Sequence, residues 1–569
     1  MAGAVQPGMS EAVCSQKPAW RLLNRYGIWA ALLLVLVVYL LSLTSHIGPF
    51  DSARFLILAR SIATGQGYRE IQYVDAPPHT LAPPGFPLLL APIWLLFPDF
   101  PGNAYAFKVV PLLFGVASWG VFYLFLRRHA DLGTPLILAI LLLGALTPLM
   151  VYFAAQELMS ETSYMFTSFL ALLLFERVAG HPRGHWLTLG IAILALVASY
   201  FIRTVGLSLF LAVLFYLALK RDFKRVILVL LLFGLLVSPW LLHNRMVGAS
   251  AVGGDYVREM WLRDYAQPDL GTIDSYWELI PRALRNGYAH VTDSLMWIFL
   301  PQLGPDRPTS LPAFLYQEWV KALIGLVIVA LSGWGMVADC RRRKEIALPA
   351  TYIIVYLGPV LLQPWVAARN LIPIAPLLFY YFPQGLQALA RGAQAVLRLS
   401  ASQLPALLAW AAVLVMLLSF ARSDRLKVRA GLACYPGGCA DPVQQSLAEA
   451  CEWVEANATE HDRILATLPN WFYLYSGRQV VRSPVEVSRY SVQPRAVAGD
   501  LFAYLQAQQV DYVVLQPERP SFDGNIYDLG EHPAFYQMIL SYREYFSLRY
   551  QTEPSPKALI YELVEPAGP

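Results

Sequence analysis

Long apolar runs recur along roughly the first three quarters of this chain, and they constrain its fold more than any other feature. Runs of roughly 17–25 apolar residues are long enough to cross the hydrocarbon of a bilayer. Such runs are centred near residues 36, 116, 143, 169, 194, 212, 233, 328, 354, 376 and 412. A soluble chain with 57% apolar and only 14% charged residues would expose large apolar patches. We therefore predict a multi-span α-helical membrane protein with about eleven spans.

The basic loops between these runs predict their orientation, because Lys and Arg in short loops stay cytoplasmic. A shorter apolar stretch, residues 83–97, opens with Pro83, Pro84 and Gly85. If this stretch lies in the interface or is re-entrant, every strongly basic short loop falls inside. These loops are residues 127–128, 177–183, 220–225, 341–344 and 391–398. We predict a cytoplasmic tail over residues 1–26, a transmembrane domain over 27–421 and an outer C-terminus.

Two long loops and a C-terminal domain lie outside in this topology. The loops are residues 45–103 and 243–317, and the second carries Trp261, Trp277 and Trp297. These tryptophans are typical of a structure at the membrane interface; a disordered loop is the alternative. Beyond residue 421 the composition becomes that of a soluble chain, and we predict an extracytoplasmic α/β domain over 422–569.

Within this domain we expect strands at residues 463–467, 479–482, 511–515 and 558–564, and helices at 443–456 (with Asp441 as N-cap) and 495–509. Five cysteines are too few for a disulfide scaffold. Cys434 and Cys439 could form one disulfide in an oxidising compartment, with Cys451 as a competing partner. The formal charge of +4 and the lack of a basic run argue against nucleic acid as a partner.

Two acidic groups stand at the predicted outer side. The first outer loop begins with Asp51, and Arg54 follows three residues later, so both can face one side of a helix. An N-cap carboxylate with an i,i+3 ion pair is the structural interpretation. The short outer turn of residues 156–161 contains Glu157 and Glu161; here Ser160 could cap the next helix, with Glu161 favouring its N-terminal end.

Two arginines run against the positive-inside tendency. Arg203 lies between two spans and Arg369 begins another, both on the outer side. Each side chain either snorkels to lipid head groups or binds an anion, for which the guanidinium offers a fork of donors matched to phosphate. The outer histidines, His46, His79, His243 and His290, form no spaced metal-ligand motif. A divalent site built from Asp51, Glu161 and a histidine stays open, although no spacing favours it.

The ensemble resembles membrane glycosyltransferases of the GT-C class, in particular the bacterial branch of the protein O-mannosyltransferase superfamily, which includes the aminoarabinose lipid A transferases. The likeness covers about residues 25–420. The matching positions are Asp51, Arg54, Phe55, Gly65 and Gly67 in the first outer loop, Pro83, Pro84 and the apolar residues after them, Met159, Ser160 and Glu161 in the second outer turn, and Arg369, Leu371, Ile372 and Pro373 at the start of a late span.

The resemblance implies a multi-pass enzyme of the bacterial inner membrane. It would transfer one hexose or pentose, with inversion, from a polyprenyl-phosphate donor to a hydroxyl of a glycan, lipid or protein on the periplasmic face. Asp51 would be the catalytic base, and Glu161 would orient the acceptor or share that role. Arg54, Arg369 and Arg203 would bind the donor phosphate, and Tyr68, His79 and Glu157 are further contact candidates. No cofactor is required by the sequence, although a divalent cation stays open.

The sequence also departs from this family. The aminoarabinose transferases carry a Glu-Lys pair directly before their Pro-Pro, where this chain has Leu81 and Ala82. This difference argues against aminoarabinose as the sugar. Two other functions remain as alternatives: a flippase or transporter of lipid-linked sugars, and a surface-glycan ligase or polymerase that uses a diphosphate donor. Inverted repeats, which many transporters contain, are not visible in the sequence.

Overall fold

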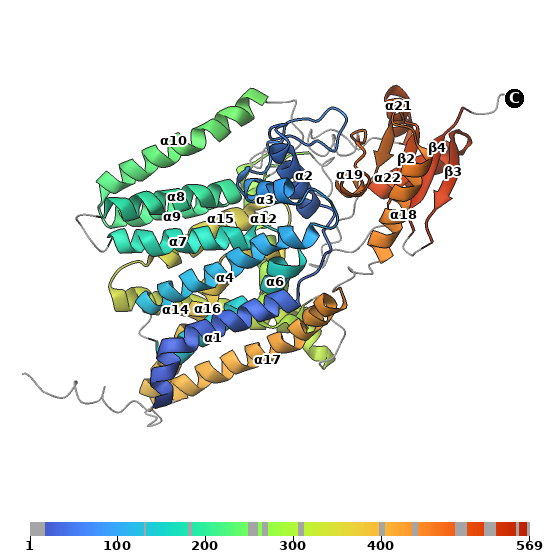
Figure 1. The fold of residues 1–569 in the computed structure, drawn as a ribbon. Helices are drawn as coiled ribbons and strands as arrows, with labels where there is room; N and C mark the ends of the chain where they lie inside the picture. Colours follow the sequence, from blue (N-terminus) through green and yellow to red (C-terminus); the bar gives the residue numbers. More distant parts are fainter. Residues whose placement is uncertain are drawn as a thin grey trace, which may run out of the picture.

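The computed structural model describes residues 18–129, 132–179, 185–247, 260–263, 271–304, 312–397, 404–434, 442–483, 498–516, 531–553 and 557–565. Long helices form a bundle in which they run side by side (Figure 1). They are α1 (Pro18–Leu41), α4 (Ala104–His129), α5 (Thr134–Ala145), α7 (Glu161–Ala179), α8 (Trp186–Ile202), α9 (Gly206–Leu219), α10 (Phe223–Val247), α14 (Glu318–Arg343), α15 (Leu348–Leu362), α16 (Ala375–Leu397) and α17 (Leu404–Ala433). Every predicted run centre lies in one of these helices.

Length and apolar composition together identify fewer spans than the apolar runs do. Within the described residues, five helices are long and apolar enough to cross a membrane: α1, α4, α10, α14 and α17. A sixth candidate joins α5 to α6 (Pro148–Val151) and η1 (Tyr152–Gln156) through a 59° bend. The break falls at Pro148, whose ring fixes φ and begins a new helix. The chain is a multi-pass membrane protein, and the number of eleven spans stays a prediction.

Two short helices of the first outer loop lie at one end of the bundle: α2 (Asp51–Ala63) and α3 (Gly85–Leu96) (Figure 1). Trp94 of α3 donates to the carbonyl of Leu56 in α2 at 2.9 Å. α3 begins where it meets the end of α8, and a Cβ at Gly85 would lie 2.5 Å from the Phe201 carbonyl oxygen. Glycine is therefore needed at this close approach. At 12 residues, α3 is about 18 Å long, shorter than the hydrocarbon layer.

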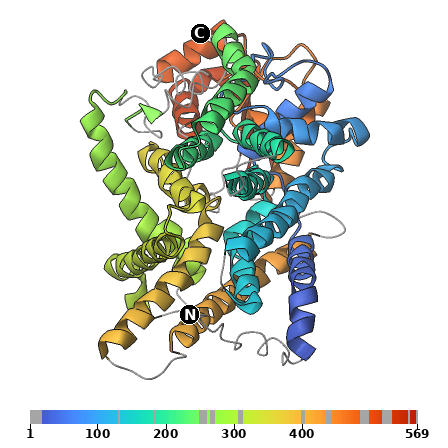
Figure 2. The ribbon, with the colours of Figure 1, turned by 90° about the vertical axis from the view of Figure 1, so that its left-hand side faces the viewer.

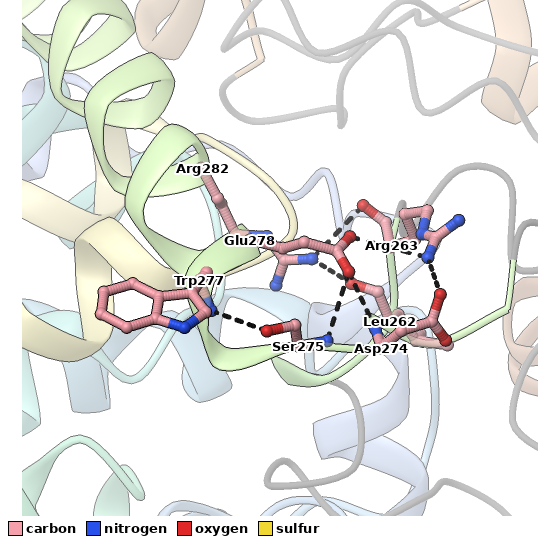
Figure 3. A network of polar contacts seen from close by, with 7 residues as sticks. All are labelled: Leu262, Arg263, Asp274, Ser275, Trp277, Glu278 and Arg282. Carbon is pink, nitrogen blue, oxygen red and sulfur yellow. Dashed lines mark hydrogen bonds and ion pairs between the residues drawn. The ribbon is translucent and has the colours of Figure 1, made fainter.

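The second outer loop is ordered in its described part, so the alternative of a disordered loop does not hold there. It contains η4 (Tyr276–Glu278), α12 (Leu279–Ala289), η5 (His290–Ser294), α13 (Leu295–Phe299), η6 (Pro301–Leu303) and η7 (Ala313–Tyr316). Arg282 is buried and donates to the carbonyls of Leu262 and Arg263 (Figure 3) and to those of Met260 and Leu362. These bonds satisfy backbone carbonyls and tie the loop to the end of α15.

The C-terminal domain contains a four-stranded sheet beside the end of the bundle at which α2 and α3 lie (Figure 1). Its elements are α18 (Pro442–Asn457), β1 (Ile464–Ala466), α19 (Pro469–Ser476), α21 (Ala498–Ala507), β2 (Tyr512–Leu515), α22 (Glu531–Ser541), η9 (Arg543–Tyr545), β3 (Phe546–Gln551) and β4 (Leu559–Leu563). The strand order is β1-β2-β4-β3, with β1 and β2 parallel and the other pairs antiparallel.

Alternate residues of each strand face opposite sides of this sheet. Val513 belongs to a small core with residues of α21 and α22, whereas Val514 belongs to the large core shared with α18, α19 and the bundle. The C-terminal domain therefore packs directly on the membrane domain. In Figure 2, turned by 90° from Figure 1, α1 (dark blue) lies at the edge of the bundle.

Several boundaries differ from the predicted ones. α17 continues past Arg422 to Ala433, so the predicted domain boundary falls inside a helix. Residues 479–482 are not a strand of the sheet: Val480 bridges Tyr73 of the first outer loop, and the Val481 amide makes one hydrogen bond to the Ile464 carbonyl of β1. Cys434 is disulfide-bonded and Cys451 is free. Cys439 and the predicted N-cap Asp441 lie outside the described residues, so the pairing of Cys434 with Cys439 stays a prediction.

Candidate functional site

Asp51 meets Arg369 although the two residues are 318 positions apart in the chain. Asp51 is the first residue of α2, and no side chain caps this helix, so the predicted N-cap role is wrong. Its carboxylate instead accepts from Arg369 Nη1 at 3.0 Å. Arg369 lies in η8 (Ala368–Leu371), the tight turn that leads into α16. The start of α2 and the turn η8, which are far apart in the sequence, thus meet at one ion pair.

Arg54, one turn along α2 from Asp51, has Glu70 as a partner. Arg54 Nε lies 3.5 Å from Oε1 of Glu70, a side chain that is only 1% exposed. His79 Nδ1 is 2.7 Å from the same oxygen, while His79 Nε2 accepts from the Ala82 amide. Nδ1 therefore carries a proton that His79 donates to Glu70. Burial opposes ionisation of Glu70, but Arg54 and His79 outweigh it and lower the pKa to about 2.

Arg203 and Glu161 form a third pair. Arg203 caps the C-terminal end of α8, and Glu161 is the first residue of α7. Arg203 Nη1 lies 2.5 Å from Glu161 Oε1 and 3.4 Å from Ser160 Oγ. The Glu161 side chain is 0% exposed, so it contacts Arg203 and does not reach solvent.

Asp51 differs from the other two carboxylates because 38% of its side chain is exposed. Burial tends to raise its pKa, but the charges of Arg369, Arg54 and Arg203 outweigh burial and lower the pKa below 3.8. Three arginines from separate parts of the chain therefore act on one accessible carboxylate. Such a cluster can hold a phosphate while the carboxylate receives a proton.

The remaining sequence candidates have structural contacts. The Tyr68 hydroxyl donates to the Ala82 carbonyl at 2.9 Å, and its ring lies edge-on to His79. The Glu157 carboxylate accepts from Ser52 and from Tyr152, the latter at 3.1 Å. Burial raises the pKa of Glu157, although Lys108 and these hydrogen bonds oppose the shift. In this conformation Tyr68, His79 and Glu157 all support the first outer loop.

Sequence reasoning missed two charged residues of this region. Nothing in the sequence around Glu70 indicates a role, since it follows Arg69 in an irregular loop. The sequence does single out Lys108, because it is a lone charge inside the apolar stretch of α4, and such charges are costly at membrane depth. Lys108 is fully buried and donates to Thr44 Oγ1 at 3.2 Å, to the Gln156 carbonyl at 2.7 Å and to the His46 carbonyl. It fixes the start of the first outer loop.

The arrangement does not fit the divalent site that the sequence left open. Within the described ranges, no three His, Cys, Asp or Glu side chains are grouped so that they could hold a metal ion. Asp51 and Glu161 each face an arginine, and both ring nitrogens of His79 are engaged. We therefore derive no step through a metal ion.

Comparison with solved structures identifies the fold. No protein-family model matches the sequence, and neither does any curated protein. Among solved structures, ArnT from Cupriavidus metallidurans in the apo state matches with a TM-score of 0.57 and 17% identity, over 96% of this chain and 99% of ArnT. ArnT bound to undecaprenyl phosphate matches with a TM-score of 0.56 and 16% identity, over 96% of this chain and 99% of ArnT.

The oligosaccharyltransferase of Archaeoglobus fulgidus, tethered to an acceptor peptide, matches with a TM-score of 0.55 and 12% identity, over 96% of this chain and 75% of that enzyme. These proteins are GT-C glycosyltransferases. The chain thus has the fold of the GT-C class along nearly its whole length, C-terminal domain included. The resemblance seen in the sequence is confirmed at the level of the fold.

Proposed function

We propose that the protein is a membrane glycosyltransferase that moves one sugar from a polyprenyl-phosphate donor to an acceptor hydroxyl. The observation that carries the proposal is the accessible carboxylate of Asp51, which pairs with Arg369 at 3.0 Å and lies within electrostatic reach of Arg54 and Arg203. The GT-C fold and its likeness to ArnT bound to undecaprenyl phosphate support the same donor class.

The proposed reaction uses these groups in one displacement. The acceptor oxygen attacks the anomeric carbon of the sugar, and the bond from this carbon to the phosphate oxygen breaks. Asp51 takes the proton of the acceptor hydroxyl. The electron pair of the broken bond stays on the polyprenyl phosphate, which gains one negative charge. Attack opposite the leaving phosphate inverts the anomeric centre.

Arg369 and Arg54 are the proposed ligands of the leaving phosphate. Negative charge grows on that phosphate in the transition state, so preorganised guanidinium groups stabilise it more than the ground state. Arg203, held by the buried Glu161, adds positive charge behind them. In this proposal Glu161 is a positioning residue for Arg203, because its side chain has no exposed surface.

The proposed setting is the bacterial inner membrane, with the N-terminus cytoplasmic and the C-terminal domain periplasmic. The distribution of basic loops supports this orientation. A glycan, lipid or protein would then supply the hydroxyl at the outer end of the bundle.

The test uses the purified protein in lipid with a panel of polyprenyl-monophosphate and polyprenyl-diphosphate sugars, and with an envelope extract as the acceptor source. Mass spectrometry follows the released carrier, polyprenyl phosphate from a monophosphate donor and polyprenyl diphosphate from a diphosphate donor, together with the glycosylated product. Release from a monophosphate donor supports the proposal. Release from diphosphate donors alone would favour the ligase or polymerase. Exchange of lipid-linked sugar across vesicles without product would favour the flippase.

A further inference from the structure

The C-terminal domain contacts the first outer loop through two hydrogen bonds and an ion pair, which together link Asn470 to Arg54. Asn470, in α19, accepts at Oδ1 from Gln72 Nε2 at 2.9 Å. The same Gln72 nitrogen donates to Glu70 Oε2. Glu70 Oε1 faces His79 and Arg54. Asn470, Gln72 and Glu70 are all buried.

The amide of Gln72 suits this bridging role. Its nitrogen carries two protons, and the structure directs one to a carboxylate and one to an amide oxygen from another domain. Loss of the Asn470 oxygen would leave a buried N–H without its acceptor, which is unfavourable unless the amide turns away. A turned Gln72 would release one oxygen of Glu70.

The consequence reaches Arg54 because Glu70 holds its guanidinium. An unrestrained arginine side chain loses rotamer entropy when it binds an anion. A carboxylate held by Gln72 and His79 removes much of that entropy beforehand. The guanidinium of Arg54 is then held in one place, one helical turn from Asp51.

We propose that Asn470 is a positioning residue that acts through Gln72 and Glu70 on Arg54, so that the C-terminal domain sets the affinity for the lipid phosphate. This inference rests on the proposed function, which supplies the phosphate. It assigns the C-terminal domain a role in binding the lipid phosphate.

Other contacts of the same domain provide a control. Gln479 Nε2 donates to the carbonyls of Ile71 at 3.1 Å and Tyr73 at 3.3 Å, on the same loop but without contact to Glu70. Substitution of Gln479 by Leu removes interdomain hydrogen bonds of similar kind. It therefore measures the effect of docking alone.

The experiment compares Asn470→Leu, Asn470→Asp and Gln479→Leu in the full-length protein in lipid, with undecaprenyl phosphate as the probe. We expect Asn470→Leu to weaken binding about tenfold, with the KM for donor rising more than kcat falls. Asn470→Asp retains an acceptor oxygen and should restore most of the affinity. Gln479→Leu should bind as the wild type does. Equal losses in Asn470→Leu and Gln479→Leu would overturn the inference.

A double-mutant cycle with Arg54→Met tests the route itself. If Asn470 acts on Arg54, Asn470→Leu has little further effect on binding once Arg54 is replaced. An undiminished further loss would overturn the inference. The same cycle, followed by thermal unfolding without ligand, should be non-additive; additive shifts in Tm would contradict the chain of contacts. Absence of binding by the wild type would refute the proposed donor, while the unfolding cycle would still judge the positioning role.

Discussion

Arg369 lies in the turn η8 and Arg282 in the loop of residues 243–317, and the two use the same side chain in opposite ways. Arg282 is 4% exposed and donates to four backbone carbonyls, of which those of Leu262 and Arg263 are seen in Figure 3, and it holds its loop against the end of α15. Arg369 reaches a carboxylate that is itself partly open to solvent. The first arginine satisfies backbone carbonyls, whereas the second pairs with the Asp51 carboxylate, which solvent reaches.

This difference separates a structural network from a chemical one. A guanidinium surrounded by carbonyls satisfies polar atoms that would otherwise be buried without partners, so its removal should lower stability. An arginine beside an exposed carboxylate lowers the pKa of that group and leaves room for a second anion, so its removal should change chemistry. Matched substitutions in the two networks test this distinction.

The largest effect is expected from Asp51→Asn. The amide keeps the size of the carboxylate but does not take the acceptor proton, and a general base contributes about 10²- to 10⁴-fold to a rate. Turnover should therefore fall by about that factor, measured as release of polyprenyl phosphate by the purified variant in lipid. The Tm should stay close to that of the wild type.

Asp274→Asn is the matched control for this prediction. Asp274 also pairs with an arginine, Arg263, but its side chain is 83% exposed and it belongs to the network of Figure 3. Its replacement should leave turnover within about twofold, since exposed ion pairs contribute little. Comparable losses in Asp51→Asn and Asp274→Asn would contradict the assignment of the base.

The second comparison is Arg369→Gln against Arg282→Met. Loss of a charge-assisted hydrogen bond costs about 1.5–3 kcal/mol, so Arg369→Gln should bind undecaprenyl phosphate about 10- to 100-fold more weakly with a nearly unchanged Tm. Arg282→Met should lower the Tm clearly, and its folded fraction should bind normally. Titration of the lipid together with thermal unfolding measures both properties. Lost stability in Arg369→Gln together with lost binding in Arg282→Met would refute the separation of a structural from a chemical network.

The pH profile gives a third test. Arg369, Arg54 and Arg203 outweigh burial and lower the pKa of Asp51, so the base stays ionised as the pH falls and activity is lost at a more acid pH than an ordinary aspartate would give. Without Arg369, burial raises the pKa, and the acid limb of kcat/KM should move upward by about one to three pH units. Rates measured from about pH 4 to pH 8 in wild type and Arg369→Gln check this shift. An acid limb that does not move would argue that Asp51 is not the titrating base.

The helices of the bundle were predictable because apolar runs are a local property. Each run centre falls in a helix, and the break at Pro148 follows from the missing N–H of proline. The strand β3 was not predicted, since it is an edge strand in which only Phe546 is buried. Residues 479–482 were expected to form a strand, but only an isolated bridge between Val480 and Tyr73 forms there, and sequence does not show that partner.

The members of the site were more predictable than their pairing. Arg203 and Arg369 stand out because positive charge is unusual in outer loops. The pairing of Arg369 with Asp51 depends on how segments 318 positions apart meet, which no local pattern reveals. Glu70 was not predictable for the same reason: its role comes from the fold of an irregular loop and from Gln72, which bonds both Glu70 and Asn470 of α19.

The smallest effect is expected at Ser275, where the loop of Arg282 begins its first helical turn. Ser275 accepts from the Trp277 amide, and Glu278 accepts from the Ser275 amide, so the two form a capping box (Figure 3). Ser275→Ala should cost about 1 kcal/mol and lower the Tm slightly, with turnover unchanged. Thermal unfolding beside Ser275→Thr, which keeps the hydroxyl, measures it. A loss of turnover at an unchanged Tm would mean that this network serves the reaction, and the contrast between the two arginines would fail.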